Sequence, residues 1–324
     1  MLVITGGAGF IGSVLVWKLN AAGRKDLLIV DQDAKTSTKW NNLKNRAFEA
    51  YYESGEFIER LEKNEFKGKI EAIFHMGACS DTTEMDTAFL KRNNTGYSER
   101  VARWCMENDA YLAYASSAAT YGGGEMGFSD DDANARHLKP LNPYGQSKLD
   151  FDLWVLRHGH EKRLTGFRFF NVYGPNEYHK GAMRSMVHKG FEQILATGKL
   201  RLFKSYKREY PDGGQKRDFI YVKDAVDAML WFYKNPAVKG IYNLGAGTAE
   251  TWNALALALF KACKKQPQIE YIDMPDAIKG QYQYFTEADL GKLKQTGCPS
   301  AFHKLEGGVA DYVLQHLTRQ DPHL

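Results

Sequence analysis

A tyrosine and a lysine stand four residues apart, at Tyr144 and Lys148, within the stretch PLNPYGQSKL. In a helix this spacing places both side chains on one face. A lysine ammonium beside a phenol lowers its pKa from the reference value of about 10, so the pair forms a base near neutral pH. Such a base serves an oxidation, a dehydration or an inversion of configuration, and the spacing alone leaves all three open.

A serine is the third candidate for chemistry. Ser117 follows the apolar stretch AYLAYAS and precedes Tyr144 by 27 residues. In an open α/β sheet, side chains at the carboxyl ends of the strands face the crevice where ligands bind. Tyr144 then takes a proton from a substrate hydroxyl while hydride leaves the same carbon, and Ser117 hydrogen-bonds the oxygen.

A glycine-rich turn predicts the hydride acceptor. TGGAGFIG, residues 5–12, fits both GxGxxG and GxxGxxG and follows an apolar run directly. The glycines allow a tight turn and let the backbone approach a pyrophosphate at the start of the next helix. Asp31 ends the next apolar run, nineteen residues past Gly12, where a carboxylate binds ribose hydroxyls. We therefore expect a dinucleotide site.

The choice between NAD and NADP stays open on the residues alone. Asp31 would bind a ribose 2′-hydroxyl and repel a 2′-phosphate, which favours NAD. Lys35 and Lys39, in the following AKTSTKW, offer cations that would neutralise that phosphate.

Strands and helices must position these residues. Apolar runs typical of strands buried on both faces lie at 2–5, 27–31, 72–75, 110–116 and 164–169. Segments of helical spacing alternate with them, at Phe10–Ala22, Asp86–Asn108 and Tyr144–His160. This alternation predicts an α/β fold with a Rossmann-like, doubly wound parallel sheet. We expect a dinucleotide-binding domain over 1–170, with 218–240 returning to it, and mainly a smaller, mixed α/β substrate-binding lobe over 171–324.

Composition narrows the class of protein. Hydrophobic residues make up 44% of the 324 residues and charged residues 25%, as in ordinary globular proteins. The net charge of +4 is too mild to indicate nucleic acid and suits a small anionic substrate. We find no apolar run of membrane-spanning length and no leader, so we expect a cytoplasmic protein without membrane contact. The four scattered cysteines predict reduced thiols, and no metal site is predicted.

Ser117, Tyr144 and Lys148, together with the glycine turn, resemble the Ser–Tyr–Lys set of the short-chain dehydrogenase/reductase superfamily. In the nucleotide-sugar 4,6-dehydratases of that superfamily, Asp-Glu follows the serine and eliminates water. Here Ala118 and Ala119 stand in those positions, and a methyl group exchanges no proton. We therefore expect no dehydration, while net oxidation and epimerisation with a retained cofactor stay open.

Stretches spread from end to end resemble one family of nucleotide-sugar enzymes, the bacterial ADP-glyceromanno-heptose 6-epimerases. They are TGGAGFIGS, FHMGACSDTTE, YASSAATYGG, PLNPYGQSK, FRFFNVYGPNEYHKG, RDFIYVKD, YNLGAGTAET and IKGQYQYFTEADL. The resemblance implies inversion at C6 of the heptose in ADP-D-glycero-D-manno-heptose, through a 6-ketone and with tightly bound NADP, for lipopolysaccharide core synthesis. A UDP-hexose 4-epimerase shares the Ser–Tyr–Lys set and is the alternative, although nothing in it calls for the HKG motif.

The resemblance also implies roles for residues. Lys148 would hold the nicotinamide ribose, and Lys180 of the HKG motif would be a second acid/base across the sugar from Ser117 and Tyr144. Lys39 would contact the 2′-phosphate of NADP despite Asp31. The expected cofactor-binding residues are Gly6, Gly9, Phe10, Ile11, Gly12, Asp31, Gln32, Lys39, Met76, Gly77, Ala78, Cys79, Ser80, Asn93, Lys148 and Val172. The expected substrate-binding residues are Ser117, Asn171, Ala182, His188, Phe203, Lys204, Ser205, Arg217 and Tyr282.

Two features depart from the family pattern. Ala182 replaces a serine that contacts substrate in relatives, so one hydrogen bond is absent. The loop 203–219 is longer than in some relatives, which affects the expected contacts of Phe203, Lys204 and Ser205. The family further implies a homo-oligomer, possibly a pentamer.

Overall fold

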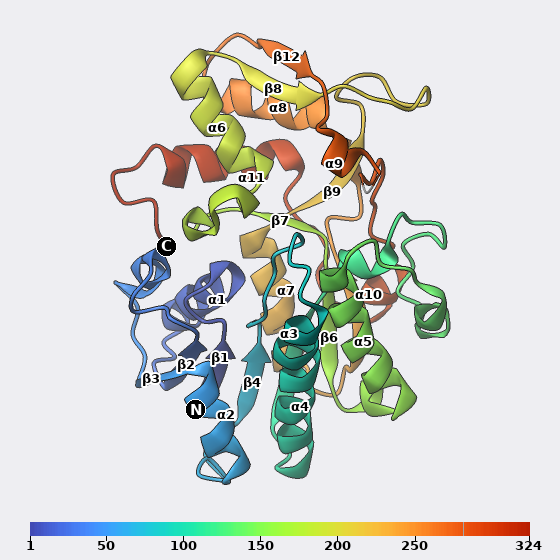
Figure 1. Cartoon of the computed structure of the whole chain (residues 1–324). Coiled ribbons are helices and arrows are strands. Elements are labelled where there is room, and N and C mark those ends of the chain that lie inside the picture. The colour runs from blue at the N-terminus through green and yellow to red at the C-terminus, as the bar shows by residue number, and fades with distance from the viewer. Residues whose placement is uncertain (281) are drawn as a thin grey trace.

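The centre of the protein is a seven-stranded parallel sheet with the strand order β10-β6-β5-β4-β1-β2-β3, which the computed structural model shows in Figure 1. The structure describes residues 1–280 and 282–324, so Gln281, inside one of the family-like stretches, lies outside the described residues. The seven strands are β1 (Leu2–Thr5), β2 (Leu27–Asp31), β3 (Ala50–Glu53), β4 (Ala72–His75), β5 (Tyr111–Ser117), β6 (Thr165–Phe169) and β10 (Gly240–Leu244). The chain winds outward in both directions from β1 and β4, and the expected Rossmann-like fold is confirmed.

Two layers of helices cover the sheet because successive strand residues point to opposite faces. Leu2 and Ile4 pack in one hydrophobic cluster with α1 (Phe10–Ala21) and α7 (Val222–Lys234). Val3 lies in the other cluster with residues of α2, α4 and α5. Those helices span Ser54–Glu62, Tyr97–Glu107 and Pro143–Arg157, and α3 (Thr87–Leu90) and η2 (Lys91–Gly96) lead into α4. Burial on both faces explains why the strands read as continuous apolar runs.

A smaller lobe lies above the carboxyl ends of the strands (Figure 1). It holds a three-stranded sheet of β11 (Ala249–Thr251), β9 (Lys216–Tyr221) and β7 (Asn171–Tyr173), and a pair of β12 (Ile269–Ile272) and β8 (Leu200–Phe203). Its longer helices are α6 (Met186–Thr197), α8 (Trp252–Ala262) and α11 (Leu305–Tyr312). The remaining short helices, counted over both parts of the protein, are η1 (Thr38–Leu43), η3 (Ala118–Tyr121), η4 (Asp132–His137), η5 (His160–Lys162), η6 (Tyr178–Met183), α9 (Asp276–Lys279), α10 (Gly291–Gln295) and η7 (Val313–Leu317).

The return of the chain to the main sheet differs in detail from the expectation. The strand within 218–240 is part of β9, which pairs with β7 and β11 rather than with the main sheet. Helix α7 then packs on α1, and β10 adds the edge strand beside β6. The domain boundary near residue 170 stays a prediction.

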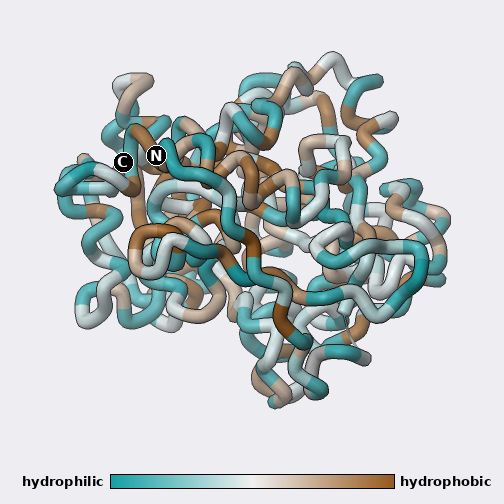
Figure 2. The backbone as a smooth tube through the Cα atoms, turned by 90° about the horizontal axis from the view of Figure 1, so that it is seen from above, coloured by the Kyte–Doolittle hydropathy of each residue, from teal (hydrophilic) through white to brown (hydrophobic). Residues whose placement is uncertain are grey.

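Seen from above, hydrophobic segments concentrate inside the molecule and hydrophilic loops surround them (Figure 2). None of the helices in the described ranges combines the length and the apolar character needed to cross a bilayer.

Candidate active site

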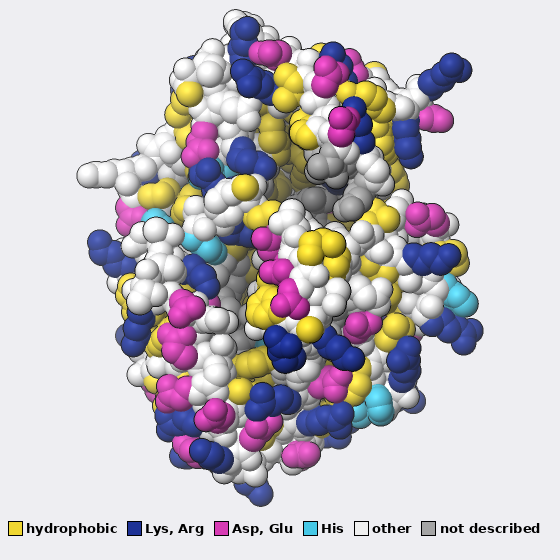
Figure 3. Space-filling model, in the orientation of Figure 1, with side chains coloured by type: hydrophobic (Ala, Val, Ile, Leu, Met, Phe, Trp, Pro, Cys, Tyr) yellow, Lys and Arg dark blue, Asp and Glu magenta, His cyan; other side chains and the backbone are white. Residues whose placement is uncertain are grey.

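A cavity of about 1550 Å³ opens between the carboxyl ends of the sheet strands and the smaller lobe. The face of the molecule in Figure 3 is hollowed in this region. Loops that follow β1, β4, β5 and β6 line the cavity together with η6, α6 and residues of the smaller lobe. The cavity therefore lies at the point where the strand order reverses, which is where open α/β sheets bind their ligands.

The glycine turn after β1 brings bare backbone to the cavity. Gly6 adopts a φ of +64°, and a Cβ there would lie 2.7 Å from Cα of Gly77 in the loop after β4. A Cβ at Gly12 would overlap the carbonyl oxygen of Gly6. Gly9 directly precedes α1, so the free N–H groups of the first helical turn face this turn. The arrangement fits a pyrophosphate, which needs close backbone approach and a positive helix end.

Asp31 and Lys39 form an ion pair where β2 ends. The Asp31 carboxylate is buried and accepts hydrogen bonds from the backbone N–H of Ala8, at 2.9 Å, and of Gln32, at 2.8 Å. The Lys39 ammonium donates to Asp31 Oδ1 at 2.9 Å and to the Gln32 carbonyl oxygen at 3.0 Å. Lys39 thus neutralises the carboxylate at the expected ribose position.

Helix α5 places the tyrosine and the lysine. Asn142 caps the helix by accepting a hydrogen bond from the Gly145 N–H at 2.8 Å, and Pro143 occupies the first turn. Tyr144 therefore lies in the first turn and Lys148 one turn later, where its ammonium donates to the Ala115 carbonyl oxygen of β5 at 2.9 Å. Both side chains line the cavity together with Ser117, so the structure brings the three residues together as expected.

Burial controls the protonation of this set. It raises the pKa of Tyr144 above its usual value, and a hydrogen bond with Ser117 acts in the opposite direction. It lowers the pKa of Lys148 to about 8, with Asp152 opposing. The expected lowering of the Tyr144 pKa by Lys148 is not found, because the ammonium faces a carbonyl oxygen and burial of the phenol dominates. Tyr144 is therefore a phenol at neutral pH in the protein alone, and a nearby positive ligand would favour its ionised form.

A buried ion pair joins α5 to the main sheet. Asp152, one turn after Lys148, accepts a hydrogen bond from Arg168 Nε of β6 at 2.9 Å. Ser116 and Tyr114 of β5 donate to the same carboxylate at 2.9 and 3.1 Å. Arg168 and Asp152 are 1% and 0% exposed, so this network joins the helix of the catalytic pair to two strands of the sheet.

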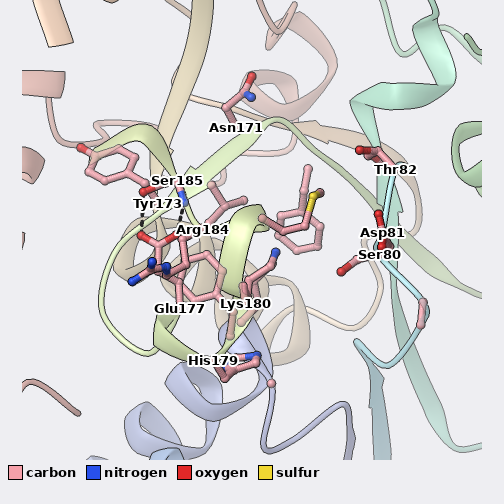
Figure 4. A pocket seen from close by; sticks show the side chains of 18 of the residues that line it. Ser80, Asp81, Thr82, Asn171, Tyr173, Glu177, His179, Lys180, Arg184 and Ser185 are labelled. Carbon is pink, nitrogen blue, oxygen red and sulfur yellow. Dashed lines mark hydrogen bonds between the residues drawn. The ribbon is translucent and has the colours of Figure 1, made fainter. Parts of the chain in front are cut away.

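Lys180 enters the cavity from η6, on the side opposite the loop that holds Ser80, Asp81 and Thr82 (Figure 4). Its ammonium lies 5.7 Å from the centroid of the Phe10 ring. Burial lowers the pKa of Lys180, and the charge of Glu177 opposes the shift. A lysine with a lowered pKa is closer to balance between amine and ammonium at neutral pH and serves better as an acid/base.

Glu177 anchors the loop that carries Lys180. Its buried carboxylate accepts hydrogen bonds from the backbone N–H of Ser185 at 2.5 Å and from its hydroxyl at 2.6 Å, as Figure 4 shows. Burial raises the pKa of Glu177, while these hydrogen bonds favour the carboxylate. Ser185 also caps α6, so the loop and that helix share one anchor.

The cavity gathers most of the residues expected from the sequence. All the expected cofactor-binding residues line it, as do five of the expected substrate-binding residues, namely Ser117, Asn171, Ala182, Phe203 and Tyr282. Their individual roles stay predictions.

Four expected substrate-binding residues lie outside the lining, for physical reasons. His188 is buried beside Arg184, 3.2 Å away, and Lys204 pairs with Asp273 at the surface. Ser205 bonds to the backbone of Lys207. Arg217 packs against the aromatic rings of Tyr282 and Trp252, which line the cavity, with its guanidinium 5.0 and 5.7 Å from their ring centroids.

Other lining residues were missed from the sequence. They include Asp81, Thr82, Glu177, His179, Arg184, Ser185 and Trp252. Asp81, Thr82, Glu177 and His179 belong to the family-like stretches, but nothing in their spacing indicates a cavity, which only the approach of distant loops creates. Within the described residues, no three His, Cys, Asp or Glu side chains gather into a potential metal site.

The way the cavity joins a nucleotide-binding glycine turn to a Tyr–Lys pair defines a nicotinamide-dependent enzyme of the short-chain class. Residues 2–245 match the NAD dependent epimerase/dehydratase family. The chain is 52% identical to the ADP-L-glycero-D-manno-heptose-6-epimerase of Nitratidesulfovibrio vulgaris over 324 residues, the full length of both chains. It is 45% identical to the enzyme of that name from Fusobacterium nucleatum, again over the full length of both. The crystal structure of the Helicobacter pylori ADP-L-glycero-D-manno-heptose-6-epimerase matches with a TM-score of 0.80 at 27% identity, covering 97% of this chain and 95% of that one.

The chain therefore belongs to the NAD dependent epimerase/dehydratase family and, within it, to the group of the ADP-L-glycero-D-manno-heptose-6-epimerases. It is an epimerase, which is a kind of isomerase, and the resemblance seen in the sequence is confirmed.

Proposed function

We propose that the protein inverts C6 of the heptose in ADP-D-glycero-D-manno-heptose and so produces ADP-L-glycero-D-manno-heptose, a precursor of the lipopolysaccharide core. The observation that carries this proposal is Lys180, a second acid/base in the cavity of Tyr144 that comes from a different part of the chain. Inversion through a ketone requires hydride to leave one face of C6 and to return to the other, so the C6 oxygen loses its proton in one orientation of the sugar and regains a proton in another. A Tyr–Lys pair by itself serves only one of these orientations.

The residues divide the chemistry between them. When bound, an oxidised nicotinamide would supply the acceptor, and later the source, of the C6 hydride. Either Tyr144 or Lys180 removes the proton of the C6 hydroxyl, and the sugar becomes a 6-ketone. Ser117 would orient the C6 oxygen. Once the ketone has turned its other face to the hydride donor, hydride returns to that face and the other acid/base protonates the oxygen. Lys148, a cation below pH about 8, would hold the nicotinamide ribose, and the positive charge of the bound nicotinamide would favour the ionised form of Tyr144.

The smaller lobe would hold the nucleotide. Phe203, Trp252 and Tyr282 line the cavity there, and the Trp252 indole donates to the Tyr282 hydroxyl at 2.8 Å. Arg217, directly behind them, has no carboxylate within ion-pair distance in residues 1–280 and 282–324. A buried guanidinium is costly without a counter-charge. We propose that the diphosphate of the substrate supplies this charge after the rings of Tyr282 and Trp252 have moved aside.

The test of the function is direct. The purified protein is incubated with ADP-D-glycero-D-manno-heptose without added cofactor and followed by proton NMR. We expect conversion to the L-glycero epimer, and we expect denaturation to release bound dinucleotide, because the redox cycle is closed. Activity on UDP-galactose but not on the ADP-heptose would favour the UDP-hexose alternative. A requirement for stoichiometric added cofactor would indicate a plain dehydrogenase.

We further propose NADP as the cofactor, with Lys39 as the ligand of the 2′-phosphate. Lys39→Ala should weaken NADP binding about tenfold or more beyond its effect on NAD, because a charge-assisted contact is lost and Asp31 is left to repel the phosphate. Lys35→Ala is the control, since its ammonium lies over the Tyr51 ring, 4.8 Å from the centroid, and does not pair with Asp31. Titrations of both dinucleotides measure the effect, and equal losses for NAD and NADP would contradict the phosphate contact.

The homo-oligomeric state is implied by the family resemblance, and the cytoplasmic location and the two-domain division by the sequence; all three stay predictions.

A further inference from the structure

The short helix η1 has contacts on two sides. Lys39 reaches the Asp31 carboxylate on one side, at the expected ribose site. Asn42, three residues later, is 2% exposed and turns its side chain to the interior. Its amide nitrogen donates to the carbonyl oxygen of Ala8 in the glycine turn at 2.9 Å and to that of Asn176 at 3.1 Å. One side chain thus joins the cofactor turn to the loop that precedes Lys180.

A further contact of Asn42 reaches the neighbour of Lys180. The amide nitrogen lies 3.4 Å from Nδ1 of His179. Burial, together with the charges of Lys180 and Lys39, lowers the pKa of His179 to about 4, so the ring is neutral at pH 7 and Nδ1 can accept. Figure 4 shows His179 beside Lys180, above the start of α1. His179 therefore lies within reach of both the ribose site and the acid/base.

The loop needs such support because its backbone is strained. Asn176 is fully buried with a φ of +73°, a conformation that costs free energy for residues other than glycine. Its side chain donates to the Ser13 hydroxyl of α1 and accepts from the Leu324 N–H, both at 3.0 Å. The Tyr178 hydroxyl donates to the Pro322 carbonyl oxygen at 2.8 Å. The loop is thus held between the glycine turn with α1 and residues 322–324.

We propose that Asn42 is a positioning residue for Lys180, because it ties the loop of Asn176 and His179 to the glycine turn and so fixes where the Lys180 amine meets the cofactor site. Lys180 follows this loop directly, and its backbone N–H is bonded to the Glu177 carbonyl oxygen at 3.0 Å. A displacement of the loop therefore moves the amine. The importance of the amine rests on the proposed function, whereas its placement by Asn42 does not.

Asn42→Ala tests the inference, with Asn41→Ala, an exposed neighbour in the same turn, as the matched control. Misplacing a reacting group by about 1 Å lowers the reaction rate by up to about 100-fold. We therefore expect kcat on ADP-D-glycero-D-manno-heptose to fall about 10- to 100-fold in Asn42→Ala. KM and bound dinucleotide should stay near wild type. Asn42→Gln, which restores an amide, should recover part of kcat. Asn41→Ala should match wild type in every measurement.

A second readout does not depend on the substrate. Lysines are labelled with acetic anhydride over a range of pH, and the Lys180 peptide is quantified by mass spectrometry. Release of the loop exposes the amine to water, so the pH midpoint of Lys180 labelling should rise towards that of surface lysines in Asn42→Ala and stay at the wild-type value in Asn41→Ala. A purely structural role for Asn42 would lower thermal stability without moving this midpoint.

The outcomes separate the two proposals. An unchanged kcat and an unchanged Lys180 midpoint in Asn42→Ala overturn the positioning role, and so do equal losses in Asn41→Ala. If Asn42→Ala does not fold, Asn42→Ser replaces it, because serine keeps a polar side chain but lacks the amide nitrogen that bonds Ala8 and Asn176, and unchanged values there overturn the inference as well. If the wild type does not convert the ADP-heptose, the proposed function fails and the labelling midpoint still decides the role of Asn42.

Discussion

Lys180→Met and Tyr144→Phe are each expected to lower kcat for epimerisation by about 10²- to 10⁴-fold, the usual loss when a positioned acid/base is removed. Bound dinucleotide should remain near the wild-type amount, because the backbone of the glycine turn holds the pyrophosphate. Lys148→Met should differ by losing both activity and some cofactor affinity, since the proposed role of its ammonium is to hold the nicotinamide ribose beside Tyr144. Steady-state kinetics and the dinucleotide released by denaturation measure these effects.

The competing mechanism uses a single base. The ketone would again turn its other face to the hydride donor, but Tyr144 would serve the oxygen in both orientations, and Lys180 would only help to bind substrate. In that case Lys180→Met raises KM and leaves kcat largely intact. A kcat within about threefold of wild type at saturating substrate would contradict the two-base mechanism. The lowered pKa of Lys180 favours two bases, because a residue that only binds an anion gains nothing from a weakened charge.

The parts of this protein that follow from local sequence were predictable. Apolar runs identified β1, β2 and β4 with their exact bounds, since strands buried on both faces consist almost entirely of apolar residues. The glycine turn and the Tyr–Lys spacing placed the cofactor and base residues in one cavity. Strand β3, by contrast, is half-buried along its length and lies at the sheet edge, and its sequence AYYE carries no continuous apolar signal.

Features that depend on tertiary structure were not predictable. The sequence predicted that 218–240 returns to the dinucleotide-binding domain, but not that the strand at its start would pair with β7, which follows a strand of the main sheet almost directly. The spacing of Glu177 and Ser185 does not indicate that the two form one anchor. The Tyr144 pKa was expected to fall and instead rises, because the degree of burial is a property of the folded cavity and not of a four-residue spacing.

The buried pair of Arg168 and Asp152 leads to the second large effect, this time on stability. Arg168→Met should lower the free energy of unfolding by about 3–5 kcal/mol, because it leaves the Asp152 carboxylate buried without its counter-charge. The Tyr121 hydroxyl, which accepts from Arg168 Nη1 at 3.1 Å, also loses its donor. Urea denaturation measures the change, provided that the m-value matches wild type.

The matched control is Arg100→Met, whose guanidinium makes a two-point contact with Glu62 at the surface, at 2.5 and 2.6 Å. Both residues of that pair are more than 40% exposed, and exposed pairs contribute about 0–1 kcal/mol. The geometry of the surface pair is the tighter of the two, so a larger loss for Arg168→Met must come from burial rather than from hydrogen-bond length.

The double variant Arg168→Met/Asp152→Asn should recover much of the lost stability, because it removes the stranded charge. The amide keeps one acceptor oxygen for Ser116 or Tyr114, and its nitrogen can donate to the other hydroxyl. Equal losses for Arg168→Met and Arg100→Met, or no recovery in the double variant, would show that uncompensated charge is not what makes Arg168 indispensable. Recovery of stability without recovery of activity would assign the pair its second role, which is to hold α5 where Lys148 and Tyr144 reach the cavity.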